Sequence, residues 1–156
     1  MTDGLDLTNV DAHAPSIRLE RVPGPVGSLR LRPAVRWPYD DEWTPEPPVS
    51  AWTPDDVARA AAWFARHAAP DEPVSTEAMW FASPAVGFRV IDRDATTIAL
   101  DVCWTQAPDV PRPTLTGQEA EPVDGDTRYA YMTMDMLHAT LTAAAAVWAG
   151  WDADFR

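Results

Sequence analysis

Apolar and polar residues alternate along several segments of the chain, a pattern that predicts β-strands with one face toward the core and one face away from it. The first two strands are expected over residues 16–22 and 28–37, with Pro23-Gly24-Pro25 supplying the turn between them. In the second strand the expected core face holds four apolar residues, Leu29, Leu31, Val35 and Trp37. Because Pro33 has no N–H group to donate, we expect this strand to lie at a sheet edge or to contain a bulge.

The same alternation continues in the second half of the chain. It predicts a hairpin over residues 78–92 bent at Ser83-Pro84, a strand over 97–105 and a short strand over 127–132. In the strand over 97–105, Asp101 points away from the apolar face, so solvent or an arginine of a neighbouring strand is expected beside it.

Two segments have helical spacing instead. Thr53 is a suitable N-cap, Pro54 fits a first helical turn, and the pattern predicts a helix over about 54–68. A second helix is expected over about 134–149, and its apolar stripe is Met134, Leu137, Leu141, Ala144 and Trp148.

The order of these elements predicts an α+β fold. Strands with short connections favour a mostly antiparallel sheet of about five or six strands, with the two helices packed on one face. Residues 1–15 have no periodicity and are expected to be a loose N-terminal leader, so that residues 16–156 form a single domain.

Composition narrows the function. The chain has 156 residues with 24 acidic side chains against 12 basic ones, all of them arginine, and a formal net charge of -12. Such a charge repels nucleic acid and anionic lipid and favours a basic protein partner. Cys103 is the one cysteine and no apolar run is long enough for a membrane span, so we expect a cytoplasmic protein. We expect it to be a monomer or a dimer. The lack of lysine is typical of a high-GC, actinobacterial-type genome.

Motifs for catalysis are absent from the sequence. It has no G-x-S-x-G turn, no metal-ligand spacing of its histidines and no nucleotide-binding glycine pattern. Cys103 lies in the middle of a predicted strand and is expected to be an inert buried thiol. We therefore expect no catalytic residues, no metal and no cofactor.

An acidic and aromatic segment after the second predicted strand is the first candidate for partner binding. Its residues are Tyr39, Asp40, Asp41, Glu42, Trp43 and Glu46. An exposed Trp43 ringed by carboxylates would be a hot spot for a basic partner, whereas a buried Trp43 would be a core anchor. A second acidic connection, over residues 107–126, adds Glu119 and Glu121 to the candidate surface.

Arginines on the polar face of the first two strands form the other candidate. Arg18, Arg30, Arg32 and Arg36 would gather on one face if the two strands pair. They would then hold an anionic group or form cross-strand pairs with acids such as Glu20. The anion site supports an alternative function, a small enzyme or ligand carrier with an aromatic pocket around Trp80 and Trp104.

The succession of predicted elements over residues 16–151 resembles small actinobacterial immunity-type proteins, the group that includes WapI-immunity-like domains. The resemblance rests on the two N-terminal strands, the helix with Asp55-Asp56-Val57, the hairpin from Trp80 to Val90 and the terminal helix. It implies a cytoplasmic, non-enzymatic protein that neutralises a toxin by binding it. The leading hypothesis is thus an acidic module that binds and blocks a basic partner such as a toxin or nuclease domain.

Overall fold

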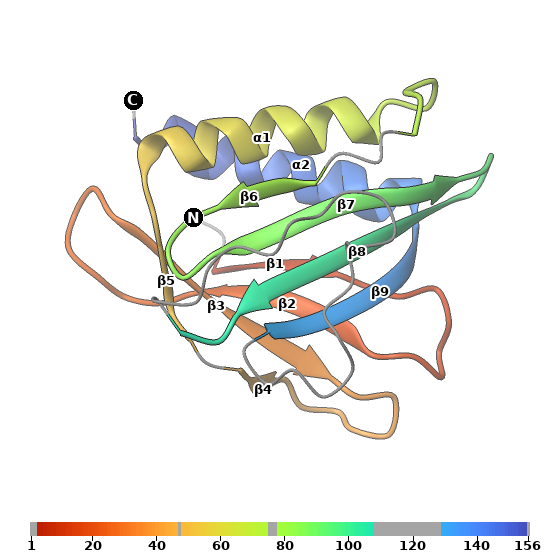
Figure 1. Cartoon of the computed structure of the whole chain (residues 1–156), viewed down its shortest axis with the longest axis horizontal. Helices are drawn as coiled ribbons and strands as arrows, with labels where there is room; N and C mark the ends of the chain where they lie inside the picture. The colour runs from red at the N-terminus through yellow and green to blue at the C-terminus, as the bar shows by residue number, and fades with distance from the viewer. Residues whose placement is uncertain (1–2, 47, 75–77, 108–128, 156) are drawn as a thin grey trace.

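The computed structural model describes residues 3–46, 48–74, 78–107 and 129–155, and within them two antiparallel sheets and two helices form one hydrophobic core (Figure 1). The elements are β1 Gly4–Leu7, β2 Ser16–Arg21, β3 Leu29–Arg36, β4 Thr44–Pro45, β5 Ser50–Trp52, α1 Pro54–Ala68, β6 Met79–Phe81, β7 Val86–Arg93, β8 Thr97–Thr105, β9 Tyr129–Leu137 and α2 His138–Ala153. The predicted α+β class is confirmed, but the strands divide into two sheets rather than one.

The first sheet has the order β1-β2-β3, and both β4 and β5 pair with the free side of β3. The second sheet has the order β6-β7-β8-β9. Backbone contacts between the two halves include a bridge between Ala51 and Ser83 and a hydrogen bond of 2.8 Å from the Val10 N–H to the Asp135 carbonyl. Their inner faces and the two neighbouring helices thus share one core (Figure 1).

The expected loose leader over residues 1–15 is wrong in part. β1 pairs with β2 so that Leu5 lies opposite Leu19 and Leu7 lies opposite Ile17. Leu5 and Leu7 are both fully buried. A strand of four residues with two apolar positions is too short to show a period, but it completes the apolar face of the first sheet.

Pro33 lies in the interior of the first sheet, so the expected edge position or bulge is wrong. Its carbonyl accepts a hydrogen bond of 2.8 Å from the Glu46 N–H. The backbone nitrogen of a strand residue points to the same side of the strand as its carbonyl oxygen. On that side of β3, β4 pairs from Ala34 onward and β5 pairs only up to Leu31. The missing donor therefore falls at the gap between two short partners.

The helix predicted over 54–68 is confirmed as α1. Thr53 and Asp56 form a capping box, and Trp63 and Phe64 pack onto Phe88 of the second sheet. At the other end, the Arg93 guanidinium donates hydrogen bonds of 2.7 Å to the carbonyls of Ala69 and Glu72. This contact fixes the C-terminal end of α1 to the end of β7.

The second helix begins later than predicted. Residues 134–137 belong to β9, which stays paired with β8 up to Leu137 opposite Thr97. Met134 and Met136 are buried at two-residue spacing, whereas Leu137 is 49% exposed. The apolar residues of this segment fit both a helical and a strand period, and the pairing with β8 decides between them.

Candidate functional site

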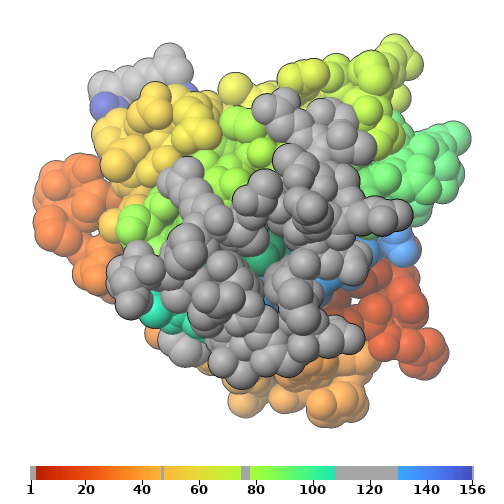
Figure 2. Space-filling model, viewed as in Figure 1, coloured from red at the N-terminus to blue at the C-terminus, as the bar shows by residue number. Residues whose placement is uncertain are grey.

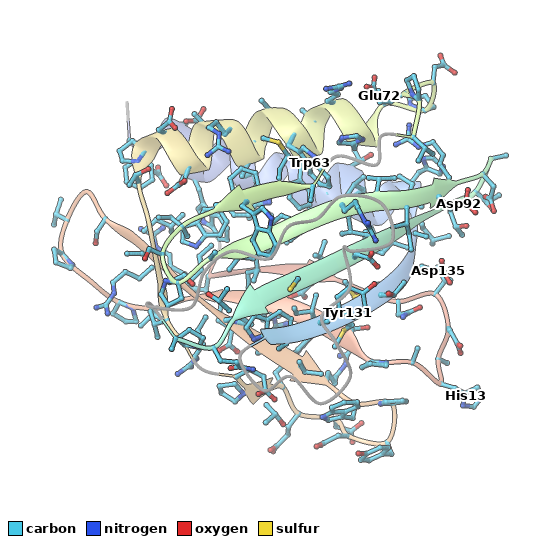
Figure 3. The ribbon with its side chains drawn as sticks, in the orientation of Figure 1. His13, Trp63, Glu72, Asp92, Tyr131 and Asp135 are labelled. Atoms are coloured by element: carbon cyan, nitrogen blue, oxygen red, sulfur yellow. The ribbon has the colours of Figure 1, made fainter. Side chains whose placement is uncertain are left out.

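Two loops lie next to each other at one end of the first sheet. In the antiparallel register Leu7 lies opposite Ile17 and Ser16 lies opposite Arg36, so the β1–β2 loop and the chain leaving β3 emerge at the same end. Figures 1 and 2 show these loops as neighbouring protrusions. His13, in the β1–β2 loop, points away from the body of the molecule (Figure 3). Sheet register therefore brings Asp11 of the β1–β2 loop to the same end of the sheet as the acidic segment that follows β3.

Local hydrogen bonds shape both loops. The Trp37 carbonyl accepts the Asp40 N–H at 3.0 Å, and the Asp40 carboxylate accepts the Glu42 N–H at 3.1 Å. In the other loop the Asp11 carboxylate accepts the His13 N–H at 2.8 Å. Aspartates that bond to the backbone two residues ahead stabilise tight turns and leave their second oxygen toward solvent.

Trp37 and Tyr39 are exposed on this end of the molecule. Trp37 is 41% exposed and Tyr39 is 87% exposed. The expectation that Trp37 belongs to the core face is wrong because β3 ends at Arg36, and the chain turns away from the sheet before the next inward position. Two large aromatic side chains in solvent are a feature of binding surfaces rather than of a packed domain.

A hollow of about 550 Å³ lies between Trp37, Pro38 and Tyr39 on one side and Ala12 and Pro15 on the other. A second hollow shares Ala12, Trp37 and Pro38, and its charged lining consists of three acids, Asp11, Asp40 and Asp41, and Arg36. The name acidic aromatic surface is used here for Asp11, Trp37, Tyr39, Asp40, Asp41 and Glu42. Among the described residues, none of its four carboxylates forms a salt bridge, so its negative charge faces outward.

Trp43 is half-buried and its ring contacts two cations. The Arg18 guanidinium is 4.4 Å from its ring centroid and the Arg36 guanidinium is 4.8 Å from it. Such contacts contribute roughly 0.5–1 kcal/mol each at exposed sites. Trp43 is therefore an anchor that holds the acidic loop against the sheet, and Trp37 and Tyr39 are the exposed aromatic residues of this surface.

The four arginines of the candidate anion site share the outer face of the first sheet, as predicted. Arg18 pairs with Asp6 at 2.5 Å, and Arg32 pairs with Glu20 at 3.1 Å. Arg36 contacts Trp43, and Arg30 is exposed near the β2–β3 turn. The cross-strand interpretation thus accounts for Arg18 and Arg32, and the four side chains do not converge on one ligand position.

The outer face of the second sheet carries a buried polar cluster. Arg89 donates to the Asp101 carboxylate at 2.7 Å, and the Thr133 hydroxyl donates to its other oxygen at 2.8 Å. Trp80 lies over Gly87 on this same face, whereas Trp104 is in the core on the opposite face. The expected pocket shared by Trp80 and Trp104 is therefore wrong.

Groups suited to nucleophilic or metal chemistry are not assembled in the described part of the chain. Cys103 is buried, and its burial raises the pKa of the thiol to about 12. His67 is buried against Trp63, and burial lowers the pKa of its imidazole from the ordinary value. No cluster of three or more His, Cys, Asp or Glu side chains lies within the described residues in a way that would hold a metal ion.

Three further predicted partner-binding residues are not included in the acidic aromatic surface. Glu46 is half-buried, with its N–H bonded to Pro33. Glu119 and Glu121 lie outside the described residues. Asp11 was not predicted, and it joins the surface because β1 pairs with β2. Recognition of the short strand with Leu5 and Leu7 in the segment 1–15 would have indicated its position.

No family model, curated protein or solved structure matches this chain. The helices of the described residues, α1 and α2, are too short and insufficiently apolar to cross a bilayer.

Proposed function

We propose that this protein binds a basic protein partner through the acidic aromatic surface. The observation that carries the proposal is the combination of exposed Trp37 and Tyr39 with carboxylates that have no arginine partner among the described residues. Protein interfaces usually have aromatic hot-spot residues at a desolvated centre and charged residues at the rim. A net charge of -12 adds long-range attraction for a cationic partner.

In this proposal the acidic residues set the association rate and the aromatic residues set the dissociation rate. Asp40, Asp41 and Glu42 steer the basic partner, so they act mainly on the association rate and lose their effect in high salt. Trp37 and Tyr39 give up solvent in the complex, so they act mainly on the dissociation rate. Trp43 positions the loop from below, through Arg18 and Arg36.

In its finer form the proposal is an immunity-type activity in the cytoplasm, in which binding blocks a basic toxin or nuclease domain. The resemblance of the sequence pattern to immunity-type proteins supports this form. Expression of the chain would then protect cells from the captured partner, and survival in a co-expression assay measures the protection.

The first test is affinity capture of the tagged chain from a lysate of its source organism, followed by kinetics with the basic protein that co-elutes. The triple variant Asp40→Asn, Asp41→Asn, Glu42→Gln should lower the association rate by about tenfold or more. The matched control Asp55→Asn, Asp71→Asn, Asp92→Asn makes the same change in charge on distant exposed acids. Equal losses in both variants would mean that net charge acts without this surface, and the proposal would be wrong.

The second test addresses the aromatic residues. Tyr39→Ala should raise the dissociation constant by a factor that corresponds to about 2 kcal/mol, since truncated hot-spot aromatics typically cost this much. Val26→Ala is the control, because Val26 is an exposed apolar residue at the other end of the first sheet. Similar affinities for the two variants would contradict the role given to Tyr39.

A further inference from the structure

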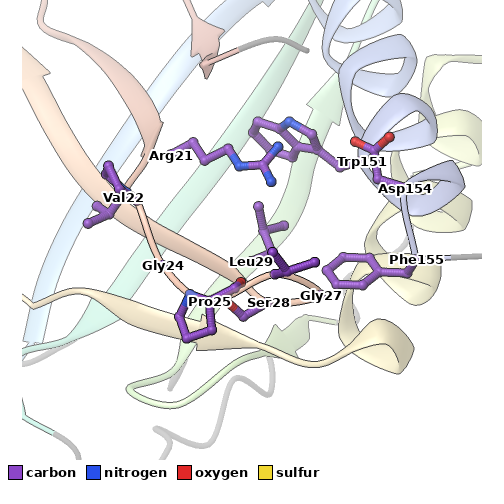
Figure 4. Close-up of a pocket in the computed structure, with 12 residues that line it drawn as sticks. Arg21, Val22, Gly24, Pro25, Gly27, Ser28, Leu29, Trp151, Asp154 and Phe155 are labelled. Atoms are coloured by element: carbon purple, nitrogen blue, oxygen red, sulfur yellow. Dashed lines mark hydrogen bonds between the residues drawn. The ribbon is translucent and has the colours of Figure 1, made fainter.

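A separate hollow lies at the opposite end of the first sheet, where the β2–β3 turn meets the C-terminal end of α2 (Figure 4). Its volume is about 430 Å³, which falls within the usual size of small-molecule sites. The lining of this pocket includes residues of the turn and the five residues Arg21, Leu29, Trp151, Asp154 and Phe155. This pocket is separate from the acidic aromatic surface, and none of its lining residues belongs to that surface.

Arg21 occupies an unusual position for a charged residue. It follows Ile17 and Leu19 at two-residue spacing, so it lies on the face of β2 that those residues turn to the core. Its Nη1 atom is buried and has no hydrogen-bond partner, and no salt bridge joins Arg21 to another described residue. A buried charged donor without an acceptor is destabilising. The guanidinium fork has the geometry to hold a carboxylate.

The remaining walls restrict what the acceptor is attached to. Trp151 and Leu29 are each 2% exposed and close the pocket beside Arg21, whereas Phe155 is half-buried and is the aromatic side chain that a ligand can contact (Figure 4). Asp154 is the C-cap of α2, where the helix dipole is negative. A simple anion would be attracted by Arg21 and repelled by Asp154, and a simple cation would be repelled by Arg21 and attracted by Asp154. A ligand with both charges would be attracted by both residues.

We propose that this pocket binds a zwitterionic small molecule with a flat apolar group, the chemistry of an aromatic α-amino acid. Arg21 pairs with the carboxylate, Asp154 with the ammonium group, and the ring lies against Phe155. The protein would then carry a small-ligand site in addition to its partner-binding surface, and either one can exist without the other.

The test is an NMR titration of the full ¹⁵N-labelled chain with L-phenylalanine. We expect saturable shifts of the amides of Gly24, Gly27 and Ser28, with affinity weakened about tenfold or more in Arg21→Gln, because a charge-assisted pair is lost. Arg30→Gln is the control, since Arg30 lies on the outer face of the same hairpin. The dispersion of each free spectrum reports whether the variant is folded.

Two analogues test the zwitterion. Phenylethylamine lacks the carboxylate and 3-phenylpropionate lacks the ammonium group, and each should bind at least about tenfold more weakly than L-phenylalanine. In Asp154→Asn, a change at an exposed residue, 3-phenylpropionate should bind as well as L-phenylalanine. The proposal is overturned by a titration without saturable shifts at the turn, by equal affinity of folded Arg21→Gln and the parent, or by equal affinity of the parent for all three compounds.

Discussion

The outer faces of the two sheets carry the same arrangement of charges in different surroundings. On the first sheet Asp6 lies opposite Arg18 and Glu20 opposite Arg32, and on the second sheet Arg89 lies opposite Asp101. The side chains of the Arg32–Glu20 pair are 38% and 23% exposed, whereas those of the Arg89–Asp101 pair are 10% and 6% exposed. Strand register places an arginine beside a carboxylate in every case, and burial decides how much each pair contributes to stability.

The largest effect is expected from breaking the buried pair. Asp101→Ala removes the carboxylate that faces Arg89 and accepts from Thr133, and it should lower the free energy of unfolding by about 3–5 kcal/mol. Urea denaturation measures the loss. The double variant Arg89→Met, Asp101→Leu should recover most of it, since apolar residues of similar volume replace buried pairs well. A loss below about 1 kcal/mol in Asp101→Ala would show that this face behaves like the exposed one.

The next effect tests packing on the same face. A Cβ at Gly87 would lie 2.6 Å from the Trp80 ring, so Gly87→Ala must displace the indole and should cost about 1–3 kcal/mol. In a Trp80→Leu background the added methyl group finds room, and its cost should nearly disappear. Thermal unfolding of the four proteins of this cycle gives the coupling. Equal costs in both backgrounds would mean that Trp80 does not pack on Gly87.

Much of the fold follows from local pattern. The capping box at Thr53 and the bend at Ser83-Pro84 are local signals, so α1 and the β6–β7 hairpin are predicted from the sequence almost at their observed bounds. The arginine row on one face follows from two-residue spacing together with the pairing of β2 and β3, which the short turn between them favours. The division into two sheets does not, because it depends on which strands pair, and period-two patterns do not encode partners.

Burial of a polar face is likewise a non-local property. Asp101 alternates with apolar residues just as Arg18 does, and a neighbouring arginine was among the expected environments, but nothing within β8 indicates that the pair is shielded from solvent. The two loop tryptophans show the same limit. Trp37 continues the alternation of β3 yet is exposed, and Trp43 is flanked by polar residues yet packs against Arg18 and Arg36.

A smaller effect is expected on the exposed side of the comparison. Glu20→Gln removes the carboxylate paired with Arg32 and should cost at most about 1 kcal/mol, because both partners keep access to water. The cost should shrink further in about 1 M salt, where exposed charges are screened within a few ångströms. Urea denaturation at two salt concentrations checks both statements. A cost equal to that of Asp101→Ala would remove the distinction between the two faces.

The smallest effect concerns an exposed acid in the β7–β8 turn. The N–H groups of Thr96 and Thr97 donate to the Asp94 carboxylate, each at 2.8 Å, and lower its pKa from 3.8 to about 2. A folded-state pKa below the unfolded one gives stability that is present above pH 3.8 and is lost as the pH falls through about 2.

Asp94→Ala should therefore be less stable than the parent at neutral pH, and the gap should close as the pH falls from 3.8 to about 2. Melting temperatures across that range measure the gap. Asp71→Ala is the control, an exposed acid outside the turn, and its gap should stay small throughout. A gap for Asp94→Ala that persists at pH 2 would mean that the turn does not depend on the ionised carboxylate. Closure of the gap would show that backbone donors, like arginines, stabilise an exposed carboxylate only while it is charged.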